Sequence, residues 1–243
     1  MDGILRCSRY AFGPNRLHYC GPDANSEIKA YIDNGVHDPG LEAMLRGFRT
    51  MYPYLKLIAE ANRIRDPFDD RVVEAYWIGN RLLEEVERKA LYFHLEEQGV
   101  KDRIGSRSFS LLEDKIRHGA VPHHSFHVLD IWKRTGNLEH EHTLESMDSC
   151  RISWGKVLAV DGPKITIETE PLVLLPGNSL ALGAPTRRTV TRALESRTDI
   201  EQLAPGNLVT VHWSVPCEAV TEDQVSMLRK YTLRHIALAN QTL

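Results

Sequence analysis

Residues 150–168 read CRISWGKVLAVDGPKITIE, and the pattern of the chain changes at this point. Residues 151–160 contain Ile, Val and Trp at close intervals and predict a strand. Residues 161–163, Asp-Gly-Pro, are typical of a turn, and residues 164–168 alternate apolar with polar side chains. A hairpin therefore begins the C-terminal part of the chain.

Later segments extend this β pattern. Residues 208–213 predict another strand, which follows the turn residues Pro-Gly-Asn at 205–207. Residues 189–203 predict a helical insertion, and residues 222–239 a C-terminal helix. Short strands separated by turns and followed by a helix predict a small OB-like β-barrel.

Before residue 149, apolar residues recur mostly at helical spacing. Helices are predicted over residues 41–64, with a division at Pro53, over 69–98 and over 108–117. A non-helical segment rich in Gly and Pro is expected to precede them, and it includes residues 13–15 and 20–23.

The predicted fold class is therefore α+β. We expect a mostly helical domain over residues 1–148 and a β-barrel domain with its C-terminal helix over residues 149–243.

Composition excludes several classes of protein. The chain has 243 residues, with 30 Lys and Arg against 33 Asp and Glu, so its net charge of −3 argues against a nucleic-acid partner. No apolar run approaches the roughly 20 residues of a membrane span, and the first residues lack the apolar segment of a signal peptide. A cytoplasmic protein without a membrane partner is expected. The four cysteines show no CxxC spacing, which favours free thiols or metal ligands.

Three segments of the C-terminal part occur together in one known family. They read CRISWGKV at residues 150–157, PGNLVTVHWSVPCEAV at 205–220 and TEDQV at 221–225. This region of about 90 residues resembles the HypC/HupF family of NiFe-hydrogenase assembly chaperones, which are small OB-type barrels. The helical N-terminal region resembles only uncharacterised hydrogenase-associated proteins.

The resemblance implies particular ligands and partners. Cys150 matches the family's essential cysteine, and His212 matches its characteristic histidine. In that family these groups help to hold iron as an Fe(CN)2CO fragment, together with a HypD-like maturation protein, before delivery to a hydrogenase large-subunit precursor. The family cysteine follows a processed N-terminus, whereas Cys150 is internal, so no α-amine takes part here.

The chemistry of these two residues supports metal binding apart from the resemblance. A thiolate binds soft or borderline metals and imidazole suits iron, and His212 follows Cys150 by 62 positions, so the two could converge across a small barrel. The alternative is that both side chains serve only packing.

The N-terminal region holds further candidate ligands. His123, His124 and His127 form a dense cluster, in which His123 and His127 would share one face of a helix, and Asp130 could complete a two-histidine, one-carboxylate iron site. Cys20 lies in a Gly-Pro turn that could present its thiolate. Residues 140–142, His-Glu-His, form a second set. Capping or surface histidines and a buried cysteine are the alternatives.

Three functions are compatible with these features. The first is a hydrogenase-maturation scaffold that carries the Fe(CN)2CO fragment through Cys150 and His212. The second is an iron-dependent enzyme that uses the histidine cluster to make or modify a ligand such as carbon monoxide. The third is a metal-free protein adaptor, with Trp154 and Trp213 as interface anchors.

Overall fold

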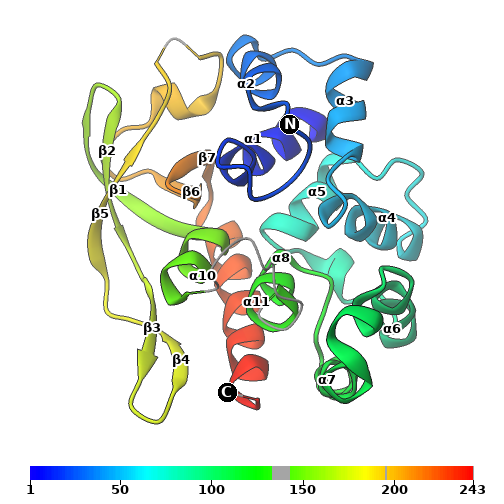
Figure 1. Cartoon of the computed structure of the whole chain (residues 1–243). Coiled ribbons are helices and arrows are strands. Elements are labelled where there is room, and N and C mark those ends of the chain that lie inside the picture. The colour runs from blue at the N-terminus through cyan, green and yellow to red at the C-terminus, as the bar shows by residue number, and fades with distance from the viewer. Residues whose placement is uncertain (133–142, 195, 243) are drawn as a thin grey trace.

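The computed structural model describes residues 1–132, 143–194 and 196–242. The helices before residue 120 lie on one side of strands β1, β2 and β5 in Figure 1, with the C-terminal helix between them. The early helices are α1 (Gly3–Asn15), α2 (Asn25–Asn34), α3 (Pro39–Arg46), α4 (Met51–Ala61), α5 (Asp70–Trp77), η1 (Arg81–Leu83), α6 (Arg88–Glu97) and α7 (Val100–Arg117). They are followed by α8 (His124–Phe126), the π-helical turn η2 (His127–Trp132) and α10 (Leu144–Cys150), and the chain closes with α11 (Glu222–Asn240).

The predicted α+β class is confirmed. The described residues form a five-stranded antiparallel sheet in the order β5-β2-β1-β6-β7 and a separate two-stranded hairpin. The sheet comprises β1 (Ser153–Asp161), β2 (Lys164–Thr169), β5 (Thr186–Thr191), β6 (Leu208–His212) and β7 (Val215–Val220), and the hairpin comprises β3 (Leu172–Leu175) and β4 (Ser179–Leu182).

The prediction of a closed barrel is wrong for the described part of the chain, because β5 and β7 are not hydrogen-bonded to each other. The turn η3 (Asp199–Gln202) lies beside β7, and the Ala219 N–H donates to Asp199 Oδ2 at 2.6 Å. Arg192 holds this turn by donating to the carbonyls of Ile200 and Glu201. A side chain thus caps the edge of β7 where a barrel would place a strand. The segment 189–203, expected to contain a helical insertion, has the end of β5 and the single 3-10 turn η3 among its described residues.

The prediction of a single helix over residues 69–98 is also wrong, because the helix is interrupted at Gly79, between α5 and η1. Gly79 has φ +100°, and a Cβ there would lie 2.2 Å from Cδ2 of Tyr231 in α11. Asn80 then caps η1 through its side-chain oxygen, which accepts from Leu82 N–H. Close packing against α11 therefore requires both the glycine and the break. Pro53, expected to divide a helix, lies in the first turn of α4, where proline is tolerated.

The first part of the N-terminal segment, predicted to be non-helical, forms α1, whereas residues 20–23 are non-helical as predicted. Asp2 caps this helix by accepting from Leu5 N–H at 3.0 Å, and the Gly13-Pro14 pair lies in its last turn. The prediction was wrong here because Gly and Pro were taken to exclude a helix, whereas a proline near a helix end removes few backbone hydrogen bonds. Cys7 and Tyr10 are fully buried, so tertiary packing stabilises the helix.

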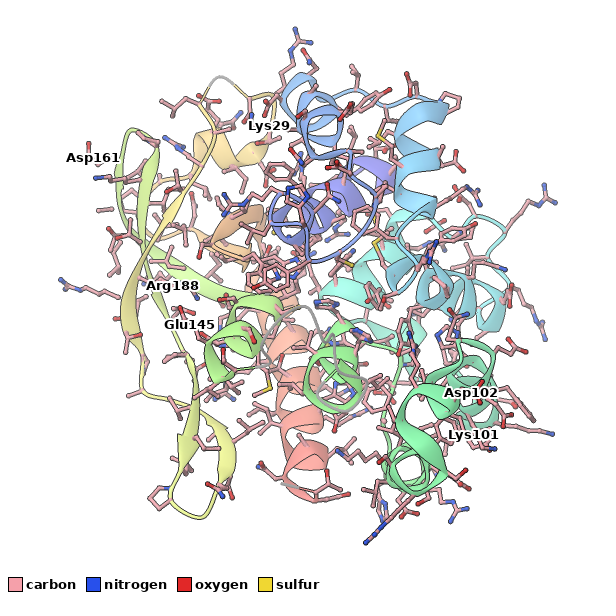
Figure 2. The ribbon with its side chains drawn as sticks, viewed as in Figure 1. Lys29, Lys101, Asp102, Glu145, Asp161 and Arg188 are labelled. Atoms are coloured by element: carbon pink, nitrogen blue, oxygen red, sulfur yellow. The ribbon has the colours of Figure 1, made fainter. Side chains whose placement is uncertain are left out.

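A buried ion network joins α1 to the sheet. Arg6 is 4% exposed, and its Nε donates to Glu218 Oε1 in β7 at 3.0 Å. Tyr10 donates its hydroxyl to the same oxygen at 2.6 Å. Burial raises the pKa of Glu218 even against the attraction of Arg6. Unlike the buried Glu218, the side chains of Asp102 and Asp161, labelled in Figure 2, lie on the outside of the molecule.

One buried apolar cluster includes residues on both sides of the domain boundary predicted at 148/149. It combines side chains of α1, α4 and α5 with Ile152, Trp154, Cys217 and Leu228. Whether the two regions are separate domains stays a prediction. Within the described ranges, no helix has the length and apolar character needed to cross a membrane.

We predict that Arg6→Met lowers the free energy of unfolding by about 3–5 kcal/mol, because it leaves the Glu218 carboxylate buried without its partner. Urea unfolding at pH 7 measures this loss. The control is Arg71→Met, which removes an exposed pair with Asp69 and should leave the unfolding midpoint unchanged. Equal stability of the two variants would contradict a structural role of the network.

Candidate metal site

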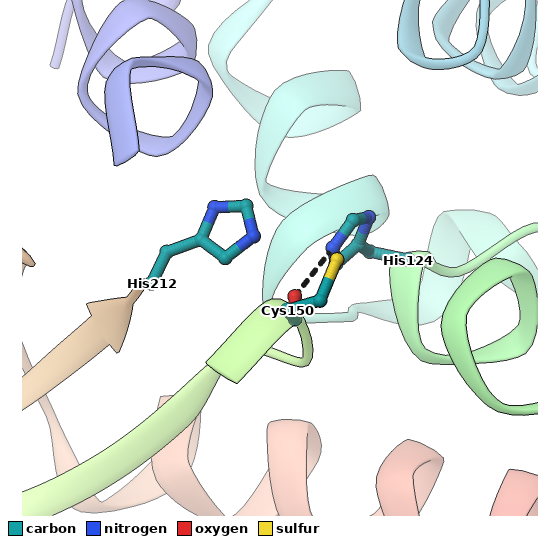
Figure 3. A group of neighbouring side chains, drawn as sticks. All are labelled: His124, Cys150 and His212. Atoms are coloured by element: carbon teal, nitrogen blue, oxygen red, sulfur yellow. Dashed lines mark hydrogen bonds between the residues drawn. The ribbon is translucent and has the colours of Figure 1, made fainter. Parts of the chain in front are cut away.

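His124, Cys150 and His212 converge at the centre of the molecule. One ligand atom from each side chain lies within 4.8 Å of the other two. Figure 3 shows the two imidazole rings and the Cys150 sulfur turned toward one another. The three residues come from the start of α8, the end of α10 and the end of β6.

Strand pairing explains why Cys150 and His212 meet. The strands β1 and β6 are antiparallel neighbours, with Ser153 opposite Val211. The residues just before β1 and at the end of β6 therefore lie at the same end of this strand pair. The Trp213 N–H donates to the Ser149 carbonyl at 2.9 Å and continues the contact beyond the strands. The sequence predicted that Cys150 and His212 converge across a barrel, whereas in the structure they meet at the ends of two adjacent elements of an open sheet.

Helix α1 fixes the orientation of His212. The His212 Nδ1–H donates to the backbone carbonyl of Tyr10 at 2.7 Å. In a regular helix that carbonyl would accept from the N–H four residues later, but that residue is Pro14, which has none. Gly13 permits the close approach, since a Cβ there would lie 2.6 Å from the His212 carbonyl oxygen.

This hydrogen bond leaves the other ring nitrogen, Nε2, carrying the lone pair. His212 Nε2 is buried and has no hydrogen-bond donor among the described residues, because the nearby Cys150 carbonyl, which raises the pKa of this ring, can only accept. Metal-binding histidines commonly donate their second nitrogen to a carbonyl in this way. The tautomer of His212 therefore fits a metal ligand.

His124 lies between two partners. Its Nε2 is 2.9 Å from the Cys150 carbonyl oxygen (Figure 3), and its Nδ1 is 3.2 Å from the Tyr76 hydroxyl. Because a carbonyl can only accept, Nε2–H donates to Cys150 and Nδ1 accepts from the Tyr76 hydroxyl in this structure, so metal binding through Nε2 requires the other tautomer. With Nδ1 protonated, the ring donates to Tyr76 and its Nε2 lone pair becomes available to a metal. Tyr76 can thus support the metal-binding tautomer.

Burial keeps all three groups neutral. It lowers the pKa of His212 to about 4, and burial together with the nearby His212 ring lowers the pKa of His124 well below its usual value. Burial also raises the pKa of the Cys150 thiol, although the Trp213 indole favours the thiolate. The imidazoles are therefore in their ligand form at pH 7, and metal binding would release the thiol proton.

A strained turn follows His212. Trp213 and Ser214 both adopt positive φ, at 50° and 63°, in the tight turn between β6 and β7. This conformation suits glycine or asparagine and is costly for tryptophan. The Tyr19 ring stacks on Trp213 at 4.3 Å between centroids and helps to hold it. Backbone strain beside a candidate ligand is typical of functional sites.

The three residues line a cavity of about 320 Å³. Its walls are mainly aromatic, and Cys20 and His127 line it as well, outside the group of three. Burial raises the pKa of Cys20 to about 11. Three ligands beside a cavity would leave coordination positions open to a small molecule.

Other predicted ligands lie elsewhere. His123 caps α8 from an extended backbone position and stacks on Tyr231 at 5.4 Å, so it does not share a helix face with His127. Asp130 forms a buried ion pair with Lys115 at 2.6 Å. The His-Glu-His set at residues 140–142 lies outside the described residues. Trp154 and Trp213, suggested as interface anchors, are 7% and 9% exposed.

Sequence reasoning missed Tyr10, Pro14 and Tyr76, which orient the two histidines. A proline four residues after the accepting carbonyl is the one signal that could have been found, but it has meaning only once α1 is known to be helical.

Comparison with known families gives one result. The sequence model of the family of unknown function DUF6390 matches residues 1–243. The chain belongs to this family. No curated protein and no solved structure matches it. The DUF6390 description carries no activity, so the relation to hydrogenase assembly stays a prediction.

We predict that Pro14→Ala weakens Co²⁺ binding by this DUF6390 protein about 10- to 100-fold, because the new N–H competes with His212 for the Tyr10 carbonyl. The free energy of unfolding should not fall, since alanine is the better helix former. Pro53→Ala in α4 is the matched control and should leave the affinity unchanged. Titration of metal-free protein measures both, and undiminished affinity of Pro14→Ala would show that the hydrogen bond does not orient the ligand.

Proposed function

We propose that this chain is a metal carrier in which His124, Cys150 and His212 hold a transition metal at the base of the cavity. The observation that carries the proposal is the group of three ligand atoms within 4.8 Å, from two buried histidines and the partly buried Cys150. The Nε2 of His212 supports it, because this buried nitrogen carries a lone pair and its polar neighbour, the Cys150 carbonyl, cannot donate to it.

The proposed cargo is iron, as the Fe(CN)2CO fragment of NiFe-hydrogenase. Support for iron comes from the donor set, since one thiolate and two imidazoles suit borderline metals. Support for the fragment, for a HypD-like partner and for a large-subunit precursor as the recipient comes only from the resemblance of residues 150–238 to the HypC/HupF family. In this proposal the protein acts in the cytoplasm.

The cavity supports a carrier of a fragment with ligands of its own. Protein groups would occupy three positions, and the remaining ones would face a space of about 320 Å³. Tyr19, Trp77 and Trp213 contribute aromatic surface to the walls of that space. A metal fragment held there would be protected until a partner opens the cavity.

A second candidate function is an iron-dependent enzyme. Three protein ligands with an open position beside a substrate-sized cavity are characteristic of catalytic metal sites. In this alternative the metal is resident and a small molecule occupies the cavity. Multiple turnovers per bound metal would distinguish the enzyme from a carrier, which releases its metal once.

The first test is Co²⁺ binding to metal-free protein. Wild-type protein should give the intense near-ultraviolet absorption of a thiolate bound to Co²⁺, and Cys150→Ser should lose it because the sulfur is removed. Cys20→Ser is the matched control, since Cys20 lines the same cavity outside the group of three, and its spectrum should persist. Loss of the band in Cys20→Ser with retention in Cys150→Ser would contradict the proposed ligand set.

The second test concerns the cargo. Protein purified without oxygen, from a host that expresses hydrogenase maturation genes, should contain iron and show infrared bands of bound cyanide and carbon monoxide. Cys150→Ser should lack both and fail to support hydrogenase maturation. Iron without these bands would favour the enzyme. Folded protein without iron and normal maturation with Cys150→Ser would favour the metal-free adaptor.

A further inference from the structure

A second pocket adjoins the metal cavity. It has a volume of about 190 Å³ and shares Thr50, Arg103 and His127 with the lining of the larger cavity. Tyr54, His94 and Arg49 complete its polar lining together with Gln98. We propose that this pocket is a binding site for a small oxyanion, held by the guanidinium groups of Arg49 and Arg103 and by the hydroxyl of Tyr54.

The charge of the lining favours an anion. Arg49 and Arg103 are its cationic side chains, and neither forms an ion pair with another described residue. Both arginines are exposed, and Arg103 donates from Nη2 to the Gln98 carbonyl at 3.2 Å, which leaves its other N–H groups available. No Asp or Glu occurs among the described residues that line either cavity. Uncompensated guanidinium groups at a concave site attract oxyanions.

Tyr54 gives a second, independent observation that points to a ligand. Its side chain is 3% exposed, and its hydroxyl has no hydrogen-bond partner among the residues that the structure describes. The ring is fixed by Tyr76 at 5.6 Å and by His94 at 4.5 Å between centroids. Buried hydroxyl groups are nearly always hydrogen-bonded, so this one is expected to donate to a bound molecule.

The neighbouring titratable groups agree with this role. Burial lowers the pKa of His94 to about 4, so it is neutral at pH 7. Burial raises the pKa of Tyr54, against the effect of Arg103, so its hydroxyl remains a donor. Asp130 is the acidic group that also acts on Tyr54, and it is held in its buried pair with Lys115.

Volume limits the size of the ligand. The pocket is smaller than the roughly 300–1,000 Å³ of sites for drug-sized molecules. A nucleotide is therefore too large, whereas a carboxylate such as formate or a tetrahedral anion such as phosphate suits the donor set. The proposal does not depend on a metal at the neighbouring site.

The test is calorimetric titration of full-length protein with sodium phosphate, sodium sulfate and sodium formate. Chelator-treated protein excludes binding through a metal, and sodium chloride holds the ionic strength constant. At least one of the three anions should bind saturably, and comparison of the three separates tetrahedral from planar oxyanions. Tyr54→Phe and Arg103→Gln should each weaken that binding about tenfold, because each removes a hydrogen bond to a charged group.

Two controls separate binding from folding. Tyr54→Phe should melt at the wild-type temperature or higher, since it removes only a buried hydroxyl that lacks a partner. Arg107→Gln removes an exposed arginine of α7 outside both cavities and should keep the wild-type affinity. The proposal is wrong if none of the three anions binds saturably, or if Tyr54→Phe and Arg103→Gln bind as tightly as Arg107→Gln.

Discussion

The buried pair of Arg6 and Glu218 sets the position of α1 against the sheet, and the candidate metal site depends on that position. Two charges in the interior stabilise a fold only when their geometry satisfies both, and Tyr10 adds its hydroxyl to the same carboxylate. From there α1 runs past the end of β6, where the Tyr10 carbonyl reaches His212. A displaced α1 would leave that imidazole free to rotate.

The group of three is neutral as a whole without a metal. Two buried imidazoles and a partly buried thiol, all neutral, need no counter-ion, which removes most of the desolvation cost of holding ligands there. A bound cation would add positive charge to the site, and the thiolate and any anion in the adjoining pocket would offset that charge. The two cavities share residues, so charge in one acts on the other across a short, poorly screened distance.

Local pattern was sufficient for β1, β2, β6 and the C-terminal helix, because alternation and capping residues act over a few positions, but it did not identify β3, β4, β5 and β7. The pairing of Cys150 with His212 was also foreseen, on the basis of a resemblance. The sequence did not indicate which of the three clustered histidines joins them. That it is His124 follows from the extended backbone at His123 and from contacts with Tyr76. The open sheet was missed because one aspartate side chain caps β7, and no periodicity encodes that contact.

The bond between Tyr10 and His212 spans 202 positions, and that between Arg6 and Glu218 spans 212. A ribosome adding about 5–20 residues per second needs roughly ten seconds or more to cover such a distance. During that time α1 lacks its partners, and contacts of such long range form late because loop closure precedes any gain from them. His124, Cys150 and His212 therefore stay apart in the nascent chain, and the group of three is assembled only in the completed protein.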